Sequence, residues 1–119
     1  MGRRVVITGT GLVIPQGVVT KEAWRNICEG VSGIRRITHF DVEEYPVKIA
    51  GEVHGFDPLD YFDKKQSKKL DPFSQFGVVA ARMAMEESGL TVDESKSEKM
   101  GVITGCGMGG LPTIANQHS

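Results

Sequence analysis

The sequence predicts an α/β fold, in which a parallel sheet is covered by helices on both faces. Residues 5–8 and 101–105 are short runs of β-branched and apolar side chains without polar alternation, which is typical of strands buried on both sides. Two longer stretches, beginning near residues 20 and 72, repeat apolar side chains at helical spacing. Strands that are buried on both sides need a helical layer on each side, so these four segments together indicate the α/β class.

The first predicted strand and the first predicted helix are separated by a glycine-containing turn. Gly9 and Gly11 end residues 5–8, and Thr20 is a suitable N-cap for a helix that stops near Gly30. One face of this helix carries apolar residues at positions i, i+3, i+4 and i+7, which are Trp24, Ile27, Cys28 and Val31. Because a free cysteine behaves mainly as a small hydrophobic side chain, we expect Cys28 to lie in the core with the rest of this face.

The segment after this helix has no long period. Within residues 34–57, Val47, Ile49 and Val53 alternate with polar or small residues. This alternation predicts a short, half-exposed strand or hairpin arm.

The clearest helix begins after Asp71. This residue is a suitable N-cap, and Pro72 occupies the first helical position, where its missing N–H group has no cost. Gly89 closes the helix. The inward face is predicted to hold Phe73, Phe76, Ala80, Met83 and Ala84. A polar linker, residues 93–99, then leads to the second predicted strand.

Size and composition indicate one soluble globular domain, residues 1–119. The net charge of −1 gives no general attraction to nucleic acid or to an anionic membrane, so we expect neither as a partner. No stretch approaches the roughly 20 apolar residues of a membrane span, and no secretory signal is visible. Two cysteines cannot form a disulfide scaffold, so we expect a cytoplasmic location.

The predicted strands are too few to complete a sheet. Two buried strands alone would leave unpaired edges and apolar surface in water. We therefore expect residues 1–119 to be a fragment of a longer protein, or a chain that completes its core with a partner.

Several segments form an ordered set that runs through the whole chain. They are residues 5–9 with Pro15 and Gly17, residues 30–34, residues 40–53, residues 64–71 and the glycine-rich residues 101–111. This set resembles the opening part of the β-ketoacyl-acyl-carrier-protein synthases, particularly the type II elongating enzyme. The resemblance implies that residues 1–119 are the N-terminal part of the first half of a thiolase-like fold. In that fold two similar halves stack as five layers (αβαβα), and the protein works as a homodimer.

The resemblance also implies a reaction whose catalytic residues we do not find in this chain. Family members load an acyl chain onto a cysteine thiolate, and malonyl-carrier protein then loses CO₂ and attacks the thioester, assisted by two histidines. These three residues lie downstream of the matched region, and none of His39, His54 and His118 falls at a family catalytic position. We therefore assign no catalytic residue, no cofactor and no metal ligand, and we expect the segment alone to be inactive.

Cys106 needs separate consideration as a possible nucleophile. It lies between two glycines at the end of residues 101–105, where a nucleophile could be presented. It precedes the family's nucleophile motif, however, and family members usually carry a small residue at this point. We expect a buried structural cysteine.

Four lysines form a candidate binding surface. If residues 64–69 are helical, Lys64 and Lys68, like Lys65 and Lys69, are i, i+4 neighbours on one basic face. From spacing alone, a solvated helix surface is the plainer interpretation. By resemblance, Lys65, Lys68 and Lys69 match positions at which the family presents basic residues to the acidic acyl carrier protein. Such contacts would act mainly on docking rate and orientation.

Met108 is a second candidate residue. A lone apolar side chain among glycines is by itself most simply a core residue. By resemblance, this position lines the acyl pocket near the dimer interface and helps to limit chain length. A flexible thioether suits a pocket that holds acyl chains of different lengths.

Two other interpretations remain open beside an elongating enzyme that takes acyl and malonyl thioesters. One is a non-catalytic homologue of the chain-length-factor type, which keeps the fold and pocket but lacks the nucleophile. The other is a nucleotide-binding α/β domain, since residues 9–14 begin like a dinucleotide fingerprint. Ile14 occupies the third glycine position of that fingerprint, and Pro15 follows where a helix should open. Gly9 and Gly11 are better explained by a tight turn and close packing.

Overall fold

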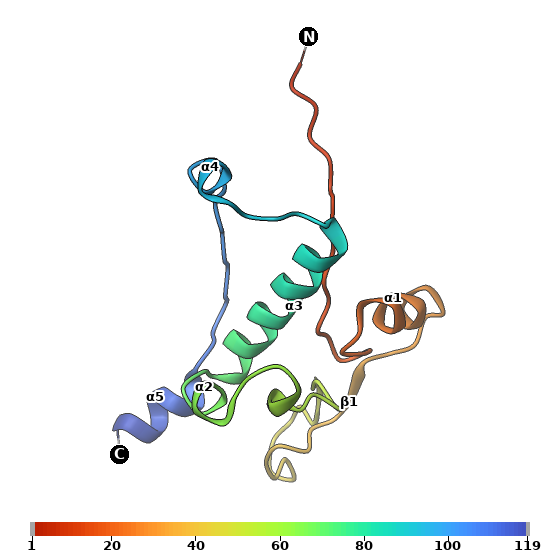
Figure 1. Ribbon diagram of the computed structural model, residues 1–119. Helices are drawn as coiled ribbons and strands as arrows, with labels where there is room; N and C mark the ends of the chain where they lie inside the picture. Colours follow the sequence, from red (N-terminus) through yellow and green to blue (C-terminus); the bar gives the residue numbers. More distant parts are fainter. Residues whose placement is uncertain (1, 119) are drawn as a thin grey trace.

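Helix α3 (Pro72–Ser88) is the longest element, and the rest of the chain is arranged around it (Figure 1). The computed structural model describes residues 2–118. The other elements, in chain order, are α1 (Thr20–Cys28), β1 (Ile34–Arg36), β2 (Ile49–Gly51), the 3-10 helix η1 (Pro58–Asp60), α2 (Lys64–Ser67), α4 (Glu94–Ser97) and α5 (Leu111–His118). Helices and a small sheet occur together, so the predicted α/β class is confirmed in this coarse form.

The sheet within residues 2–118 is a two-stranded antiparallel hairpin and not a parallel sheet. β1 pairs with β2 so that Arg35 lies opposite Ala50. The strand predicted from the alternation around Ile49 is therefore present. It is limited to residues 49–51, because β1 offers only three residues for pairing.

Residues 5–8 and 101–105 are extended but belong to no sheet, so the prediction that they are buried strands is wrong for this chain. The side chains of Val5, Val102 and Ile103 are 89, 90 and 99% exposed. A strand needs a neighbouring backbone to satisfy its N–H and C=O groups. Figure 1 shows these two segments on different sides of α3, where neither can pair with the other.

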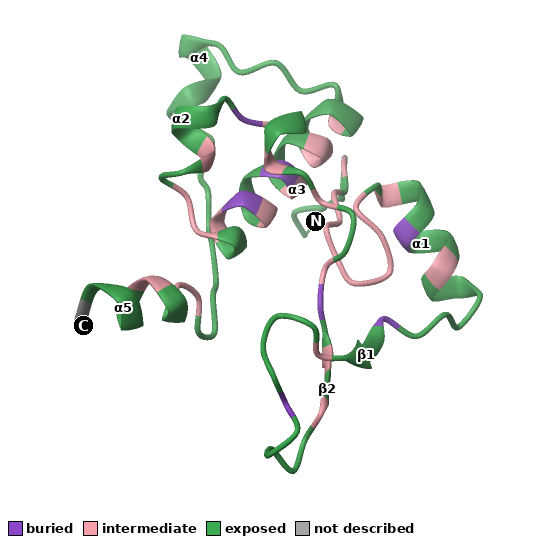
Figure 2. Ribbon diagram, turned by 90° about the horizontal axis from the view of Figure 1, so that it is seen from below, coloured by how far each residue is buried: buried purple, intermediate pink, exposed green. Residues whose placement is uncertain are grey.

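The core of the described residues is correspondingly small. Its buried apolar side chains are Ala23, Val42, Phe62 and Val79. Figure 2 shows these purple positions scattered over α1, α3 and the connecting segments, with exposed residues between them. The radius of gyration is 17.5 Å, whereas a compact domain of this length would have about 13.5 Å. The described part of the chain is thus an open arrangement with uncovered apolar faces.

Helix α1 forms where the sequence predicts it, but two details differ. Val19 occupies the N-cap position, and the Thr20 hydroxyl instead accepts a hydrogen bond of 3.2 Å from the backbone N–H of Leu12. Cys28 is exposed, so its predicted place in the core is wrong. The physical reason is that α1 buries Ala23, and no element within residues 2–118 covers its larger apolar face.

The ends of α3 lie as predicted. Gly89 closes the helix in the left-handed conformation, with φ of 62°. Asp71 occupies the N-cap position but makes no capping hydrogen bond through its side chain. Its carboxylate accepts a hydrogen bond from the hydroxyl of Thr113 and thereby joins the first turn of α5 to the start of α3.

The backbone of residues 9–11 lies directly on the C-terminal half of α3. A methyl group on Gly11 would lie 1.9 Å from the carbonyl oxygen of Ala80, so only glycine fits there. The neighbouring Thr10 donates hydrogen bonds from its N–H and its hydroxyl to the carboxylate of Glu87. These two hydrogen bonds hold the pKa of Glu87 below its usual range. The close packing expected for this turn is therefore packing onto α3.

We predict that Gly11→Ala destabilises the protein. Its new methyl group would push the segment away from α3 at a cost of about 1–3 kcal/mol. Gly77→Ala is the matched control, because a Cβ at Gly77 meets nothing within 4 Å and alanine favours a helix interior by about 1 kcal/mol. Urea unfolding of both variants checks this prediction, and equal stabilities would contradict it.

Candidate functional site

The four predicted lysines lie on one short turn that we call the lysine turn, residues 64–69. It consists of α2 and the two residues that follow, and the side chains of Lys64, Lys65, Lys68 and Lys69 are all exposed. Asp63 begins the turn, because its carboxylate accepts hydrogen bonds of 2.8 Å from the backbone N–H groups of Lys65 and Gln66. A four-residue helix is unstable by itself, so this cap is one of the contacts that define the turn.

The lysine turn is fastened to α3 by polar contacts. The buried side chain of Gln75 donates hydrogen bonds from Nε2 to the carbonyl oxygens of Ser67 and Leu70, at 2.9 and 3.0 Å. About two turns further along α3, Arg82 donates to the carbonyl oxygen of Tyr61 at 2.7 Å, and its guanidinium lies 5.1 Å from the centre of the Phe62 ring. These contacts fix both the approach to the turn and its end.

Aromatic rings pack between α3 and the residues that precede the lysine turn. Phe56 stacks on Tyr61, with ring centres 5.3 Å apart, and meets Phe76 of α3 edge to face at 4.9 Å. Such pairs add to the free energy of burial. The residues that lead into the lysine turn are therefore packed against α3.

The charges of the lysine turn are not neutralised within the described residues. The ion pairs found within residues 2–118 join other side chains and involve none of these four lysines. Four positive charges on one exposed turn create a local patch on a chain whose net charge is −1. Such a patch attracts an acidic surface at moderate salt concentration.

A hollow of about 300 Å³ lies between the lysine turn and α3. Its surface is mostly apolar but includes two cationic side chains, and its lining consists of Phe62, Gln66, Lys69, Leu70, Val78 and Arg82. The lysine turn therefore carries positive charge beside an apolar depression, and interfaces commonly combine apolar and polar surface in this way.

Met108 lies on the loop before α5, and its side chain is 77% exposed. The loop contacts the start of α3, because a Cβ at Gly109 would meet the ring of Phe73 at 2.6 Å and one at Gly110 would meet Asp71 at 3.0 Å. The lysine turn reaches the same end of α3 from the preceding residues (Figure 1). The structure thus brings the two predicted sites to one end of one helix, on separate segments.

Cys106 is exposed, so the prediction of a buried structural cysteine is wrong. It lines a hollow of about 350 Å³ between α3 and residues 102–106, together with Phe73 and Gly77. The thiol is exposed because residues 101–105 form no strand and no layer covers them in the described part of the chain.

Glu52 is a buried polar residue that the sequence analysis did not single out. Its carboxylate accepts hydrogen bonds from the N–H and hydroxyl groups of Thr38, at 3.0 and 2.7 Å, and from the N–H of His39 at 3.2 Å. The imidazoles of His39 and His54 lie 3.9 and 3.8 Å away. Burial raises the pKa of Glu52, but the hydrogen bonds outweigh it, and the pKa lies below its usual range.

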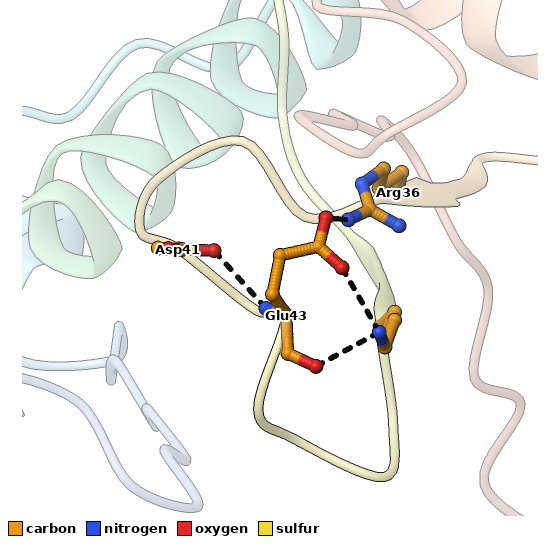
Figure 3. Close-up of polar contacts among 4 residues, drawn as sticks. Arg36, Asp41 and Glu43 are labelled. Atoms are coloured by element: carbon orange, nitrogen blue, oxygen red, sulfur yellow. Dashed lines mark hydrogen bonds and ion pairs between the residues drawn. The ribbon is translucent and has the colours of Figure 1, made fainter.

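A second carboxylate fastens the loop of the hairpin. Glu43 forms ion pairs with Arg36 and Lys48, and its N–H donates to the carboxylate of Asp41 at 3.0 Å (Figure 3). All of these groups are exposed or half-buried, so each pair contributes little stability by itself. Together with Glu52, this cluster has a structural role in shaping residues 36–52. No group of three potential metal ligands comes together within residues 2–118, and no helix there has the length and apolar character to cross a membrane.

Comparisons with known proteins show the family to which the chain is similar. The family described as "Beta-ketoacyl synthase, N-terminal domain" matches residues 2–119. Curated relatives named 3-oxoacyl-[acyl-carrier-protein] synthase 2 come from Staphylococcus aureus (strain COL), Coxiella burnetii and Vibrio cholerae, with 41, 43 and 42% identity over 116 residues. Each alignment covers 98% of this chain and 28% of the relative, so the chain spans just over a quarter of their length.

One solved structure is also similar. It is described as "The ishigamide ketosynthase/chain length factor" and superimposes with a TM-score of 0.66 at 37% identity. The similarity covers 75% of this chain and 22% of that one.

We predict that Glu52→Gln weakens the fold near neutral pH and reduces its loss of stability in acid. Because the folded-state pKa of Glu52 is lowered, its contribution is present above the unfolded-state pKa and is lost as pH falls through the folded-state value, that is, below about 4.5. The control is Glu44→Gln, which removes an exposed carboxylate in the same hairpin loop. Urea unfolding between about pH 7 and pH 3 measures both. The same acid dependence in Glu52→Gln and the parent protein would contradict this role.

Proposed function

We propose, from the premise that this chain belongs to the β-ketoacyl synthase family and corresponds to its N-terminal domain, that it is part of a 3-oxoacyl-[acyl-carrier-protein] synthase. That enzyme elongates an acyl chain by decarboxylative Claisen condensation with malonyl-carrier protein. The support is the 41–43% identity to relatives with that name, through nearly the whole chain. The proposed substrates are acyl and malonyl thioesters, and the proposed partner is acyl carrier protein.

In the proposed reaction, an acyl group moves from its carrier to a cysteine thiolate, and the carrier thiol leaves. The malonyl thioester then loses CO₂, and the resulting carbanion attacks the acyl thioester carbonyl and expels the thiolate. A preorganised pair of donors stabilises the oxyanion of that step. We assign none of these roles to a residue of this chain. The cysteine and two histidines would come from the part of the protein that residues 1–119 do not include.

The contribution of this chain is carrier-protein docking, and the observation that carries it is the exposed, unneutralised lysine turn on α3. Lys65, Lys68 and Lys69 would contact the acidic surface of the carrier protein. Because these charges are exposed, they would accelerate and orient encounter more than they would strengthen the final complex. Their effect would fall as salt is raised.

The finer architecture is also a proposal. Residues 5–8 and 101–105 would become strands of a thiolase-like five-layer fold when further chain supplies their neighbours, and the enzyme would be a homodimer. Their β-branched composition and almost complete exposure in this chain support that view. The two free cysteines suit a reducing cytoplasm as its location.

A second candidate function has one specific observation in its favour. The similar solved structure is described as a ketosynthase/chain length factor, so a non-catalytic partner subunit would share this segment. Incubation of the intact protein with labelled acyl-carrier protein separates the two. A synthase retains a covalent acyl thioester, and a chain-length-factor subunit does not.

We predict that Lys65→Glu, Lys68→Glu and Lys69→Glu together raise the KM for acyl-carrier protein in the intact protein by about tenfold or more at low salt. Higher ionic strength should reduce the difference, and kcat with a small thioester substrate should not change. The control changes the same net charge elsewhere, through Lys21→Glu, Arg25→Glu and Lys99→Glu. A triple lysine variant that behaves like this control would refute docking at the turn.

We predict that Met108→Phe in the intact enzyme shortens the range of acyl chains that it elongates, because a rigid ring fills the end of the proposed pocket. Met108→Leu, which keeps a similar volume, is the control. Product analysis by mass spectrometry checks both variants. An unchanged product profile for Met108→Phe counts against a pocket role for this residue.

A further inference from the structure

Gln75 is a buried polar residue on a helix that otherwise buries apolar side chains. Only 5% of it is exposed. Both N–H groups of its amide are used, one on the carbonyl oxygen of Ser67 and one on that of Leu70. These two carbonyls lie immediately before Lys68 and immediately after Lys69. A single side chain of α3 thus holds the backbone on both sides of two proposed docking lysines.

The lysine turn needs such an external contact at its end. The last carbonyl groups of a helix have no partner within it, and a four-residue helix has little stability by itself. Asp63 satisfies N–H groups at the start of the turn, and Gln75 satisfies carbonyl groups at the end. Arg82 fixes Tyr61, which precedes the turn, and makes no hydrogen bond to residues 67–70. The backbone N–H group of Lys69 bonds within the turn, to the carbonyl oxygen of Gln66, whereas Gln75 joins the end of the turn to α3.

We propose that Gln75 is a positioning residue for carrier-protein docking. Its amide fixes the backbone of residues 67–70, so that the ammonium groups of Lys68 and Lys69 are already oriented before a partner binds. A partner then loses less binding free energy in ordering the turn. This inference rests on the proposed function, because it concerns the same basic surface.

The requirement for an amide at this position follows from its hydrogen bonds and not from its volume. Leucine would fill nearly the same space, yet it would leave the carbonyl groups of Ser67 and Leu70 without their donors. The turn would then be free to move away from α3 while retaining all four lysine charges. Positioning and charge can therefore be separated by experiment.

The test uses the intact protein and compares Gln75→Leu with two other variants. The first is the triple variant of Lys65, Lys68 and Lys69, which removes the charges themselves. The second is Val79→Ala, which removes volume from a residue of α3 that is 1% exposed, one turn beyond Gln75. Acyl-carrier protein is the probe, its Kd is measured at low and high salt, and the melting temperature is recorded for every variant.

We expect Gln75→Leu to weaken carrier-protein binding by about three- to tenfold at low salt, because the turn must be ordered on binding. The salt dependence should persist, since the lysines remain, and kcat with a small thioester should not change. Val79→Ala should lower the melting temperature without weakening binding. If Gln75→Leu does not fold, Gln75→Met, which is flexible and also lacks N–H donors, takes its place in the same comparison.

The outcomes distinguish the inference from the function on which it rests. If the triple lysine variant binds like the parent protein, docking at this turn fails, and the role of Gln75 fails with it. If the triple variant binds weakly but the folded Gln75 variant binds like the parent, only the positioning role is refuted. Equal weakening by Val79→Ala would also refute it, because the effect would then follow from general destabilisation.

Discussion

The direct contact between the backbone of residues 9–11 and α3 is the constraint on which the arrangement of this chain depends. Two helical carbonyl groups lie so near Gly9 and Gly11 that any side chain at these positions would collide with them. Thr10 adds hydrogen bonds to Glu87 at the same place. This contact helps to place α1, because the Thr20 hydroxyl at the start of α1 accepts a hydrogen bond from the N–H of Leu12, directly after the turn. α3 therefore contacts residues 9–11, the lysine turn and the loop before α5.

The sequence predicted the helices better than the strands, and the difference has a physical cause. The period of α3, its proline and Gly89 act within a few residues, so they determine the helix locally. A strand is complete only when a second backbone pairs with it. Residues 5–8 have a typical strand composition, but within residues 2–118 no backbone pairs with them. Their prediction was wrong for this reason, although their conformation is extended.

The candidate site was likewise predictable only where the local sequence determines it. The spacing of Lys64, Lys65, Lys68 and Lys69 was sufficient to predict one basic turn, since helical neighbours follow from sequence separation. Gln75 and Glu52 were missed, because their importance lies in partners that only the folded chain brings near. Gln75 lies outside the apolar face predicted for α3, so the period of that helix gave no signal for it. The exposure of Cys28 and Cys106 could not be predicted, since it depends on which surfaces other elements cover in the folded chain.

The contact between Thr10 and Glu87 also has a consequence for the order of events during synthesis. The two residues are separated by 77 positions. At a translation rate of about 5–20 residues per second, Thr10 is made about 4–15 s before its partner. During that interval residues 9–11 are present without the helix on which they pack. Docking of the N-terminal turn is therefore a late step, which has to follow the synthesis of α3.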